Sequence, residues 1–343
     1  MKILVTGAAG FIGAELCHTL NRKTTLLCGI DDFSGSDSDA VRWARLKRMG
    51  ITPKKLSSDS GFEFHRISLN DYPAIEQLFI RHEFDIVIHL AAYAGIEHSS
   101  MLPYKYLHNN MSSFNAVIEL CRIFMPKHFI FASSASVYGN LPSNEQSEGI
   151  TPCYPLNIYA ATKQSNEIIA RCYAENYKLR TTGLRLFSVY GARMRCDLAP
   201  MKFSKALLSR LPITIRDGDM RRDFTHISDV VHVICSIIDH YDNKCLSPRL
   251  FDIFNVGAGV PRTVSELVSI LESKLGVTAQ IQKTQPLQIE ASQTFAFQKS
   301  ISALLGYFER KKLEDGLDDL VHWLKTDEAQ PWLDSNEDSS LSA

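Results

Sequence analysis

The 343-residue chain carries almost no net charge, because its 37 Lys and Arg residues nearly balance its 38 Asp and Glu residues. It therefore lacks the basic excess that would attract nucleic acid or an anionic membrane to the protein as a whole. Its eight cysteines form no C-x-x-C pair and no zinc-type cluster with histidine, which indicates small hydrophobes in a reducing compartment. No apolar run reaches the length of a membrane span, and a strand pattern begins where a signal peptide would lie. We expect a cytoplasmic protein without a nucleic-acid partner, a membrane partner or a bound metal.

What the sequence does contain is a regular alternation of strand-like and helix-like segments. The strand-like segments, such as KILVTG at the start and FDIVIHLAA near residues 84–92, are continuously apolar, which indicates burial on both faces. Helical patterns follow near residues 11–22, 110–124 and 157–177. This alternation predicts an α/β fold with a doubly wound parallel sheet of the Rossmann type.

The segment TGAAGFIG carries three glycines directly after the first strand, at the start of the first helix. Gly7 allows a tight turn, Gly10 allows the backbone to approach a pyrophosphate, and Gly13 allows the helix to pack closely on the strand. The helix begins with Phe11 and Ile12, and its N-terminus faces the phosphates. A glycine-rich turn without a ligand is the alternative, and the flanking strand and helix disfavour it. The motif therefore predicts a dinucleotide site.

Two carboxylates end the second strand, Asp31 and Asp32. An acidic side chain at this position accepts hydrogen bonds from the adenosine ribose and repels a 2′-phosphate, so the cofactor is expected to be NAD. The spacing from the glycines favours Asp31 as the ribose ligand. For Asp32, a role at the ribose and a solvated loop carboxylate are equally good interpretations.

The segment YAATK places Tyr159 and Lys163 four residues apart, on one face of the predicted helix 157–177. A phenol loses its proton near pH 10, which is too high for a useful base, but a neighbouring ammonium and a cationic nicotinamide both favour the phenolate. A surface Tyr–Lys pair is the alternative, and the dinucleotide motif upstream disfavours it. We expect Tyr159 to be the catalytic base, and Lys163 to lower its pKa while binding the nicotinamide ribose.

The segments TGAAGFIG, HLAA, SSASVYG, YAATK, LRLFSVYG and RRDF together resemble the extended short-chain dehydrogenase/reductase family. More narrowly, they resemble its nucleotide-sugar 4-epimerases that act on UDP-glucuronic acid, over roughly residues 1–325. The resemblance implies an isomerase with tightly bound NAD that converts UDP-glucuronic acid reversibly to UDP-galacturonic acid through a 4-keto sugar. It also implies a homodimer formed through the helices at 110–124 and 157–177, and a cofactor site completed by Leu90, Ala91 and Ala92.

The same resemblance assigns the hydroxyls of the SSASVYG segment to the sugar. Ser134 and Ser136 are implied to hydrogen-bond the C4 oxygen while Tyr159 removes its proton. Related 4,6-dehydratases carry an Asp–Glu pair at the positions of Ala135 and Ser136, and related uronate decarboxylases carry a Glu at Ser136. Because this chain has no carboxylate there, the resemblance favours oxidation and re-reduction at C4 without loss of water or CO2.

The resemblance also implies how the rest of the nucleotide sugar is held. Ser188 and Arg195 match the residues that bind the sugar carboxylate, and an Arg can do so with two parallel hydrogen bonds. Arg193 is an alternative for this role. Arg222 matches the residue that contacts the UDP phosphates, and Asn110 matches an Asn near the substrate, with a plain helix N-terminal residue as an equal interpretation.

Two positions depart from the subgroup pattern. Leu287 and Gln288 replace a Gly–Asp pair in the last substrate loop, and Glu97 stands where the uronate epimerases often have Arg. A carboxylate facing an anionic substrate would weaken its binding. A 4-epimerase of a neutral UDP-hexose or of another uronate therefore stays open. A non-catalytic NAD-binding protein is disfavoured, because Tyr159 and Lys163 are both present.

The expected domain organisation follows from a change in the sequence pattern after residue 191, where short segments rich in Arg, Asp and Pro replace the regular alternation. We expect an NAD-binding domain over 1–185 that also takes in about 225–258. The nucleotide-sugar-binding lobe is expected over 186–224 and 259–325. The polar stretch 33–61 is predicted to be a surface insertion, and the acidic, Ser-rich residues 326–343 are predicted to form a disordered tail.

Overall fold

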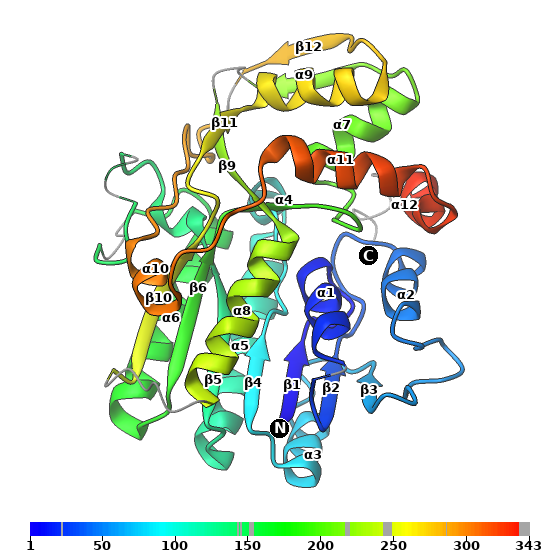
Figure 1. Cartoon of the computed structure of the whole chain (residues 1–343). Coiled ribbons are helices and arrows are strands. Elements are labelled where there is room, and N and C mark those ends of the chain that lie inside the picture. Colours follow the sequence, from blue (N-terminus) through cyan, green and yellow to red (C-terminus); the bar gives the residue numbers. More distant parts are fainter. Residues whose placement is uncertain are drawn as a thin grey trace.

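The computed structural model describes residues 1–21, 23–142, 144, 146–150, 154–216, 220–242, 249–285 and 287–335. A seven-stranded sheet forms its centre, in the order β10-β6-β5-β4-β1-β2-β3, and every neighbouring pair is parallel (Figure 1). The strands are β1 (Lys2–Thr6), β2 (Leu26–Ile30), β3 (Phe62–His65), β4 (Ile86–His89), β5 (His128–Ser134), β6 (Thr181–Leu186) and β10 (Phe251–Val256). This architecture confirms the predicted doubly wound parallel sheet.

Helices cover both faces of the sheet. One face packs against α3 (Tyr72–His82), α5 (Pro103–Phe124) and α6 (Ile158–Tyr177), and the other against α1 (Phe11–Leu20) and α8 (Ile227–Asp242). Consecutive residues of β1 alternate between the two cores, since Ile3 and Val5 join one cluster and Leu4 joins the other. Burial of both strand faces explains why the strands read as continuous apolar runs.

The strand order reverses beside β1, which pairs with β2 on one side and β4 on the other. In open parallel sheets a ligand binds beyond the carboxyl ends of the strands at such a switch point. Three predicted segments leave the sheet at this edge: the glycine turn after β1, residues 90–92 after β4, and the 3-10 turn η1 (Ala135–Tyr138) after β5. The fold therefore brings the cofactor and catalytic motifs together.

Most of the remaining elements lie above this edge, whereas α10 (Lys299–Leu305) lies beside β10 (Figure 1). They include a three-stranded sheet in the order β11-β9-β7 and a two-stranded sheet of β12 and β8. Their bounds are β7 (Ser188–Tyr190), β8 (Ile213–Arg216), β9 (Arg221–His226), β11 (Pro261–Thr263), β12 (Ile281–Thr284), α4 (Ile96–Met101), α7 (Ala199–Leu208), α9 (Val264–Leu275), α10 (Lys299–Leu305), α11 (Leu313–Leu324), η3 (Asp327–Ala329) and α12 (Gln330–Asp334). The division of the chain into an NAD-binding domain and a nucleotide-sugar-binding lobe stays a proposal.

The stretch 33–61 is not only a surface insertion, because it contains helix α2 (Asp39–Lys47). Ser38 caps this helix by accepting a hydrogen bond from the backbone N–H of Val41. Arg45 is 1% exposed and donates to Asp37 and to the carbonyl of Ala9 in the glycine turn. The polar composition concealed a helix that supports the cofactor motif.

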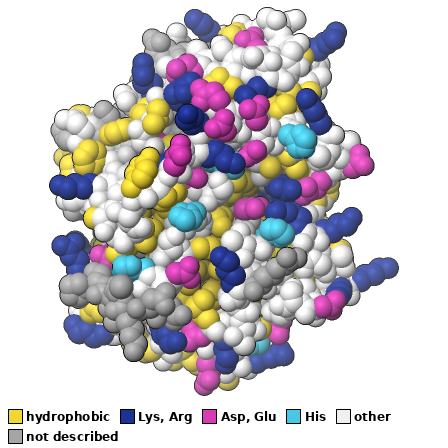
Figure 2. Space-filling view, in the orientation of Figure 1, with side chains coloured by type: hydrophobic (Ala, Val, Ile, Leu, Met, Phe, Trp, Pro, Cys, Tyr) yellow, Lys and Arg dark blue, Asp and Glu magenta, His cyan; other side chains and the backbone are white. Residues whose placement is uncertain are grey.

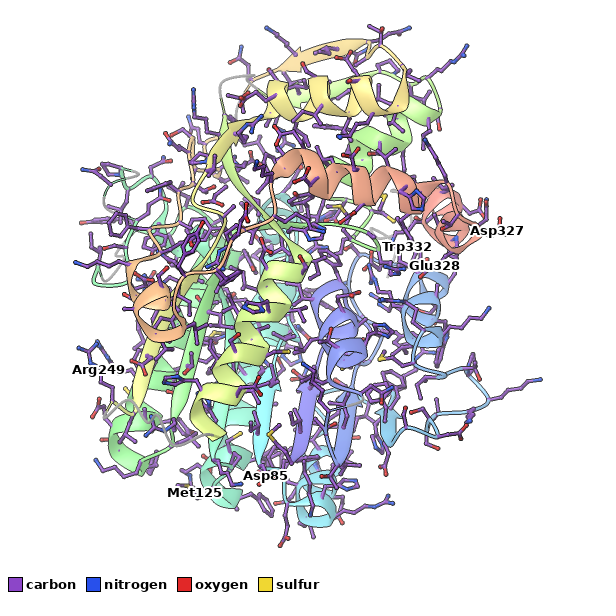
Figure 3. All side chains as sticks on the ribbon, viewed as in Figure 1. Asp85, Met125, Arg249, Asp327, Glu328 and Trp332 are labelled. Atoms are coloured by element: carbon purple, nitrogen blue, oxygen red, sulfur yellow. The ribbon has the colours of Figure 1, made fainter. Side chains whose placement is uncertain are left out.

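The prediction of a disordered tail is wrong for residues 326–335. Trp332 of α12 is fully buried, its indole N–H donates to the carbonyl of Met194 at 2.8 Å, and its ring lies 5.5 Å from the guanidinium of Arg45. Figure 3 shows Trp332 and Glu328 beside α2. Long-range packing orders this acidic stretch, while residues 336–343 lie outside the described part of the chain.

Acidic and basic side chains are interspersed over the face seen in Figure 2, in keeping with the balanced composition. Within the described residues, we find no helix with both the length and the apolarity needed to cross a membrane.

Candidate active site

The glycine turn leaves room for backbone only. Gly7 has a φ of 73°, and a Cβ added there would lie 2.8 Å from the backbone nitrogen of Ala91. A Cβ at Gly13 would lie 2.0 Å from the carbonyl oxygen of Gly7. Gly10 caps α1, whose first-turn amides at Phe11 and Ile12 have no partner within the helix. The turn therefore presents bare amides at a helix N-terminus, which suits a pyrophosphate.

Asp31 and Asp32 lie differently. Asp31 accepts hydrogen bonds from the backbone N–H groups of Ala9 at 3.0 Å and Phe33 at 2.8 Å. Burial raises the pKa of Asp31, and these hydrogen bonds together with Arg42 partly oppose that rise. Asp32 accepts from the N–H of Ser34 in its own exposed loop. Of the two, Asp31 is therefore the one joined to the glycine turn.

The third predicted part of the cofactor site follows β4. The N–H of Leu90 donates to the carbonyl of Thr6, and the N–H of Ala91 donates to the Thr6 hydroxyl. These bonds hold the stretch up to Ala92 against the end of β1. The bare amides of the glycine turn, the acidic side chain of Asp31 and the backbone after β4 are the groups that a dinucleotide without a 2′-phosphate needs.

Tyr159 and Lys163 occupy one face of α6, as predicted, and face the end of β5. The Lys163 ammonium donates to the carbonyl of Ala132 at 2.9 Å and lies 6.0 Å from the Tyr159 ring centre. Burial lowers the pKa of Lys163 to about 8. Burial raises the pKa of Tyr159, while a hydrogen bond with Ser134 and the charge of Arg195 lower it. In the protein alone, Ser134 and Arg195 therefore oppose the rise, rather than the ammonium that we expected.

A buried ion pair beneath this site was not predicted from the sequence. Glu167 is one further helical turn along the face of Tyr159 and Lys163, and its carboxylate accepts two hydrogen bonds from Arg185 at 2.7 and 2.9 Å. It also accepts a hydrogen bond from Ser133. Side chains four residues apart share a helix face, so the Y-x-x-x-K-x-x-x-E spacing was the available signal. Through Ser133 of β5 and Arg185 of β6, the Glu167 carboxylate fixes α6 on two neighbouring strands.

A cavity of about 120 Å³ collects four of the predicted sugar and catalytic residues: Ser134, Ser136, Ser188 and Arg222. Ser134 accepts a hydrogen bond from the N–H of Ser136 at 3.1 Å, which turns the chain into η1. Among the described residues, those that line the cavity include no Asp and no Glu. The cavity thus combines hydroxyl groups with one guanidinium.

Arg195 and Arg193 point to different places. Arg195 donates from Nε and Nη2 to Asp197 and from Nη2 to the carbonyl of Ala94, which leaves its Nη1 edge outside these contacts. Arg193 pairs with Glu328 in the C-terminal segment at 2.7 Å. Because only Arg195 acts on the pKa of Tyr159, Arg195 is the better candidate for the sugar carboxylate.

Asn110 does not present a free group to a substrate. It lies within α5 rather than at a helix N-terminus, and it is 1% exposed. Its amide nitrogen donates to the Tyr93 carbonyl and the Thr162 hydroxyl, while its oxygen accepts from the Tyr93 N–H at 2.8 Å. These contacts join the loop after β4 to α5 and α6. Asn110 therefore positions the site, and the expected substrate contact has no support in this geometry.

A network of ion pairs lies next to residues that line the cavity. Arg216 donates to Glu97 of α4 at 2.7 Å and to Glu290 at 2.8 Å, and Glu290 also lies 3.7 Å from Arg222. The departure at Glu97 is thus accompanied by a cation across the cleft, which the sequence pattern did not reveal. The second departure lies nearby, since the carbonyl of Leu287 accepts a hydrogen bond from the N–H of Glu290.

Comparisons with known proteins agree with this geometry. The family model described as "NAD dependent epimerase/dehydratase family" matches residues 3–257. The chain is 32% identical to Protein CapI of Staphylococcus aureus over 339 residues, 94% of this chain and 98% of that protein. It is 34% identical to UDP-glucuronate 4-epimerase 4 of Arabidopsis thaliana over 335 residues, 94% of this chain and 75% of that protein.

A solved structure extends the likeness to three dimensions. UDP-glucuronic acid 4-epimerase from Bacillus cereus, in complex with UDP-glucuronic acid and NAD, matches with a TM-score of 0.84 at 30% identity, over 95% of this chain and 99% of that one. The glycine turn, the Tyr–Lys pair and these matches lead to one conclusion. The chain belongs to the NAD-dependent epimerase/dehydratase family.

Proposed function

We propose that the protein interconverts UDP-glucuronic acid and UDP-galacturonic acid by reversible epimerisation at C4 through a 4-keto sugar. The observation that carries this proposal is the cavity that unites Ser134 and Ser136 with Ser188 and Arg222, beside Tyr159 and Arg195. Hydroxyl groups, one buried phenol and two guanidiniums suit an anionic nucleotide sugar that is oxidised and reduced at one carbon.

The proton chemistry belongs to Tyr159 and Ser134. NAD, when bound, supplies the acceptor and later the donor of the hydride at C4. Tyr159 takes the proton of the 4-hydroxyl as that carbon is oxidised, and it returns the proton when the ketone is reduced from the other face. Ser134 is hydrogen-bonded to Tyr159 and lowers its pKa, so it also serves as a relay between phenol and sugar oxygen. Lys163 adds positive charge at the ribose side.

The sugar carboxylate is assigned to Ser188 and the Nη1 edge of Arg195. Oxidation at C4 creates a β-keto acid, which loses CO2 when the breaking C–C bond aligns with the carbonyl π system. A planar guanidinium that fixes the carboxylate in another orientation protects the intermediate. The absence of acidic residues among the described lining of the cavity also removes the general acid that dehydration requires.

The experiment is to incubate the purified protein with UDP-glucuronic acid, without added cofactor, and to follow the sugar protons by NMR. We expect a C4 epimer to grow to a fixed ratio without release of CO2. A UDP-pentose product would contradict the assignment of the carboxylate to Ser188 and Arg195. A lack of any change, with or without added NAD, would contradict the proposed activity.

The second candidate function is a 4-epimerase of a neutral UDP-hexose or of another uronate, which Glu97 and the Leu287–Gln288 departure favour. Arg195→Lys separates the candidates, because Lys keeps the charge and loses the bidentate geometry. If the substrate is a uronate, this variant loses activity on UDP-glucuronic acid and keeps any activity on UDP-glucose. Equal loss on both sugars would assign Arg195 to the scaffold instead.

We also propose a cytoplasmic homodimer formed through α5 and α6. Phe114 and Ile118 pack in the core and are unavailable for such an interface. Tyr104, Leu107 and Ile168 are 78%, 45% and 55% exposed on these helices, and they offer an apolar surface instead. Light scattering of the wild-type protein and of a Tyr104→Glu variant tests this, since the charge should dissociate the dimer.

A further inference from the structure

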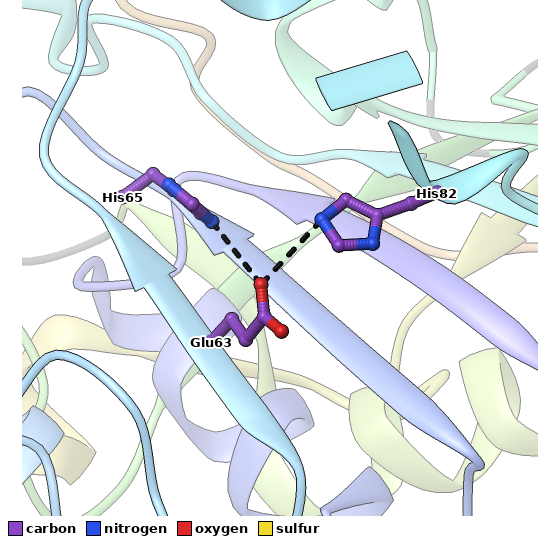
Figure 4. A group of neighbouring side chains, drawn as sticks. All are labelled: Glu63, His65 and His82. Atoms are coloured by element: carbon purple, nitrogen blue, oxygen red, sulfur yellow. Dashed lines mark ion pairs between the residues drawn. The ribbon is translucent and has the colours of Figure 1, made fainter. Parts of the chain in front are cut away.

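Three side chains converge at the edge of the central sheet, away from the nucleotide cleft. Glu63 and His65 lie two residues apart on the edge strand β3, so they share one face of the sheet. His82 is the last residue of α3, which packs on that face. Figure 4 shows both imidazole rings turned toward one carboxylate oxygen of Glu63.

The separations between the donor atoms do not suit hydrogen bonds. Glu63 Oε2 lies 3.7 Å from His65 Nε2 and 3.5 Å from His82 Nε2, and all three donor atoms lie within 4.8 Å of one another. Protein N–H···O hydrogen bonds are shorter, about 2.7–3.2 Å. A tetrahedral Zn²⁺ ion with bonds of about 2.0–2.1 Å holds its ligand atoms roughly 3.3–3.4 Å apart. The two separations from Glu63 to the imidazoles are therefore close to an edge of a zinc tetrahedron, and the third, between the two imidazoles, lies within 4.8 Å.

The two imidazoles also have unmet bonding capacity. His82 is 7% exposed, and the Nε2 atoms of both His65 and His82 are buried without a hydrogen-bond partner among the residues that the structure describes. Buried polar atoms are nearly always hydrogen-bonded, so two unpaired imidazole nitrogens that face one carboxylate need an explanation.

We propose that Glu63, His65 and His82 bind one divalent transition-metal ion, Zn²⁺, with the fourth coordination position left to water. Two nitrogen ligands and one carboxylate select Zn²⁺ over Mg²⁺ or Ca²⁺, which prefer oxygen ligands throughout. The ion would join the edge strand β3 to the end of α3. This proposal departs from the expectation, made from the sequence, that the protein has no metal site.

The position of the ion relates it to the cofactor site without entering the reaction. The carbonyl of His65 accepts a hydrogen bond from the N–H of Asp31 at 3.2 Å, and Asp31 is the proposed ribose ligand. A metal on the His65 ring would therefore stiffen the strand on which Asp31 rests. We expect the ion to stabilise this edge of the fold and to leave the turnover chemistry unchanged.

The charge of Arg81 offers a second way to test the proposed metal site. Arg81 directly precedes His82 in the last turn of α3, so its charge lies near a cation bound at the same place and repels it. Arg81→Gln should therefore strengthen metal binding several-fold while the ligands stay in place. An increase of this kind would not follow if the three side chains formed only an ion pair with protonated histidine.

The test uses the full-length, NAD-loaded protein, purified without a histidine tag and freed of metal by a chelator. Zn²⁺ is titrated in competition with a chromophoric chelator, and Co²⁺ is added separately to read tetrahedral coordination from its visible absorption. We expect one ion per chain. Because outer-shell partners alone change metal affinity about 10–100-fold, loss of the ligands in Glu63→Gln or His82→Gln should weaken binding by more than roughly 100-fold.

Two further variants complete the design. His322→Gln removes an exposed histidine of α11 and should leave Zn²⁺ binding unchanged. His65→Gln tests the site at its partly exposed ligand, in case the buried His82 variant does not fold. The proposal is overturned if the wild-type protein fails to bind micromolar Zn²⁺, or if Glu63→Gln and His65→Gln bind it as tightly as the wild type. Because no readout uses sugar turnover, failure of the proposed function would not affect this result.

Discussion

The dinucleotide end and the sugar end of the cleft are built in different ways. At the dinucleotide end, contacts run through the backbone, as in the bonds from Ala9 and Phe33 to Asp31. At the sugar end, contacts run between charged side chains from distant segments, such as Arg216 with Glu97 and Glu290. Backbone contacts depend on the spacing of a few glycines, whereas side-chain charges can be exchanged one at a time. The first end therefore preserves a cofactor, and the second can change its sugar.

The catalytic pair lies between these ends and gives the largest expected effect. Tyr159→Phe removes the proton acceptor while keeping the ring, so kcat should fall about 10²–10⁴-fold with NAD still bound. NMR assays measure kcat, and the absorbance of the released cofactor measures the amount of bound NAD. Tyr177→Phe, at the exposed end of the same helix, is the matched control. If Tyr159→Phe keeps activity within tenfold of the wild type, the base is a different group.

The dinucleotide end should be intolerant of a single added methyl group. In Gly13→Ala the new Cβ would meet the Gly7 carbonyl at 2.0 Å, so the helix must move from the turn. Such overpacking costs about 3 kcal/mol, and we expect loss of bound NAD as well. Gly149→Ala is the control, because a Cβ there meets nothing within 4 Å. Urea unfolding and the NAD content of the purified proteins check both, and an unchanged Gly13→Ala protein would refute the tight-turn argument.

Buried histidines in both halves predict a loss of stability in acid. Burial lowers the pKa of His89 below the dinucleotide turn to about 3, and that of His226 in β9 to about 4. Between the unfolded value near 6.5 and these folded values, only the unfolded chain binds the proton. The free energy of unfolding should therefore fall as the pH drops from about 6.5 to 4, by about 1.4 kcal/mol per pH unit for each histidine.

Denaturation at several pH values checks this, with His89→Asn and His226→Asn as variants. Each variant should reduce the slope of the unfolding free energy against pH by the contribution of one histidine, because Asn cannot take up a proton in this range. If neither changes the slope, the acid sensitivity comes from other groups. If only one does, the pKa of the other histidine is not lowered in the folded protein, and its contribution to acid sensitivity falls away.

The sequence predicted most of the sheet domain, because its signals are local. The apolar runs located β1, β4 and β5, and the Y-x-x-x-K spacing placed Tyr159 and Lys163 on one helix face. Helix α2 was missed since its composition is polar and its buried Arg45 is held by Asp37 and the backbone of Ala9.

The errors share one physical cause, which is that partners lie far away along the chain. Trp332 is ordered by Met194 and Arg45, so the acidic composition around it gave no warning. The contacts of the Asn110 amide with Tyr93 and Thr162 were likewise not visible in the sequence, and its contact with the substrate stays a prediction. The pair between Arg216 and Glu97 was also invisible, since neither residue indicates the other in the sequence.

The smallest predicted effect tests whether that pair opposes the substrate. Glu97 is 55% exposed at the cleft, so removing its charge should change affinity by less than about 1 kcal/mol. We expect Glu97→Gln to lower KM for UDP-glucuronic acid by up to about fivefold at low salt, with kcat unchanged. Glu175→Gln, exposed on α6, is the control, and kinetics at two salt concentrations measure the difference.

The same variant separates two origins of the repulsion. If KM falls equally for UDP-glucuronic acid and UDP-glucose, Glu97 acts on the diphosphate that both share. If KM falls only for the uronate, Glu97 acts on the sugar carboxylate. The Glu97 charge would then weaken the binding of uronates in particular. A rise in KM would reverse the interpretation, because Glu97 would then be holding Arg216 in place for the substrate. In that case the Arg216–Glu97 ion pair is part of the binding site. Charged residues at the sugar end would then tolerate single substitutions less well than the comparison of the two ends implies.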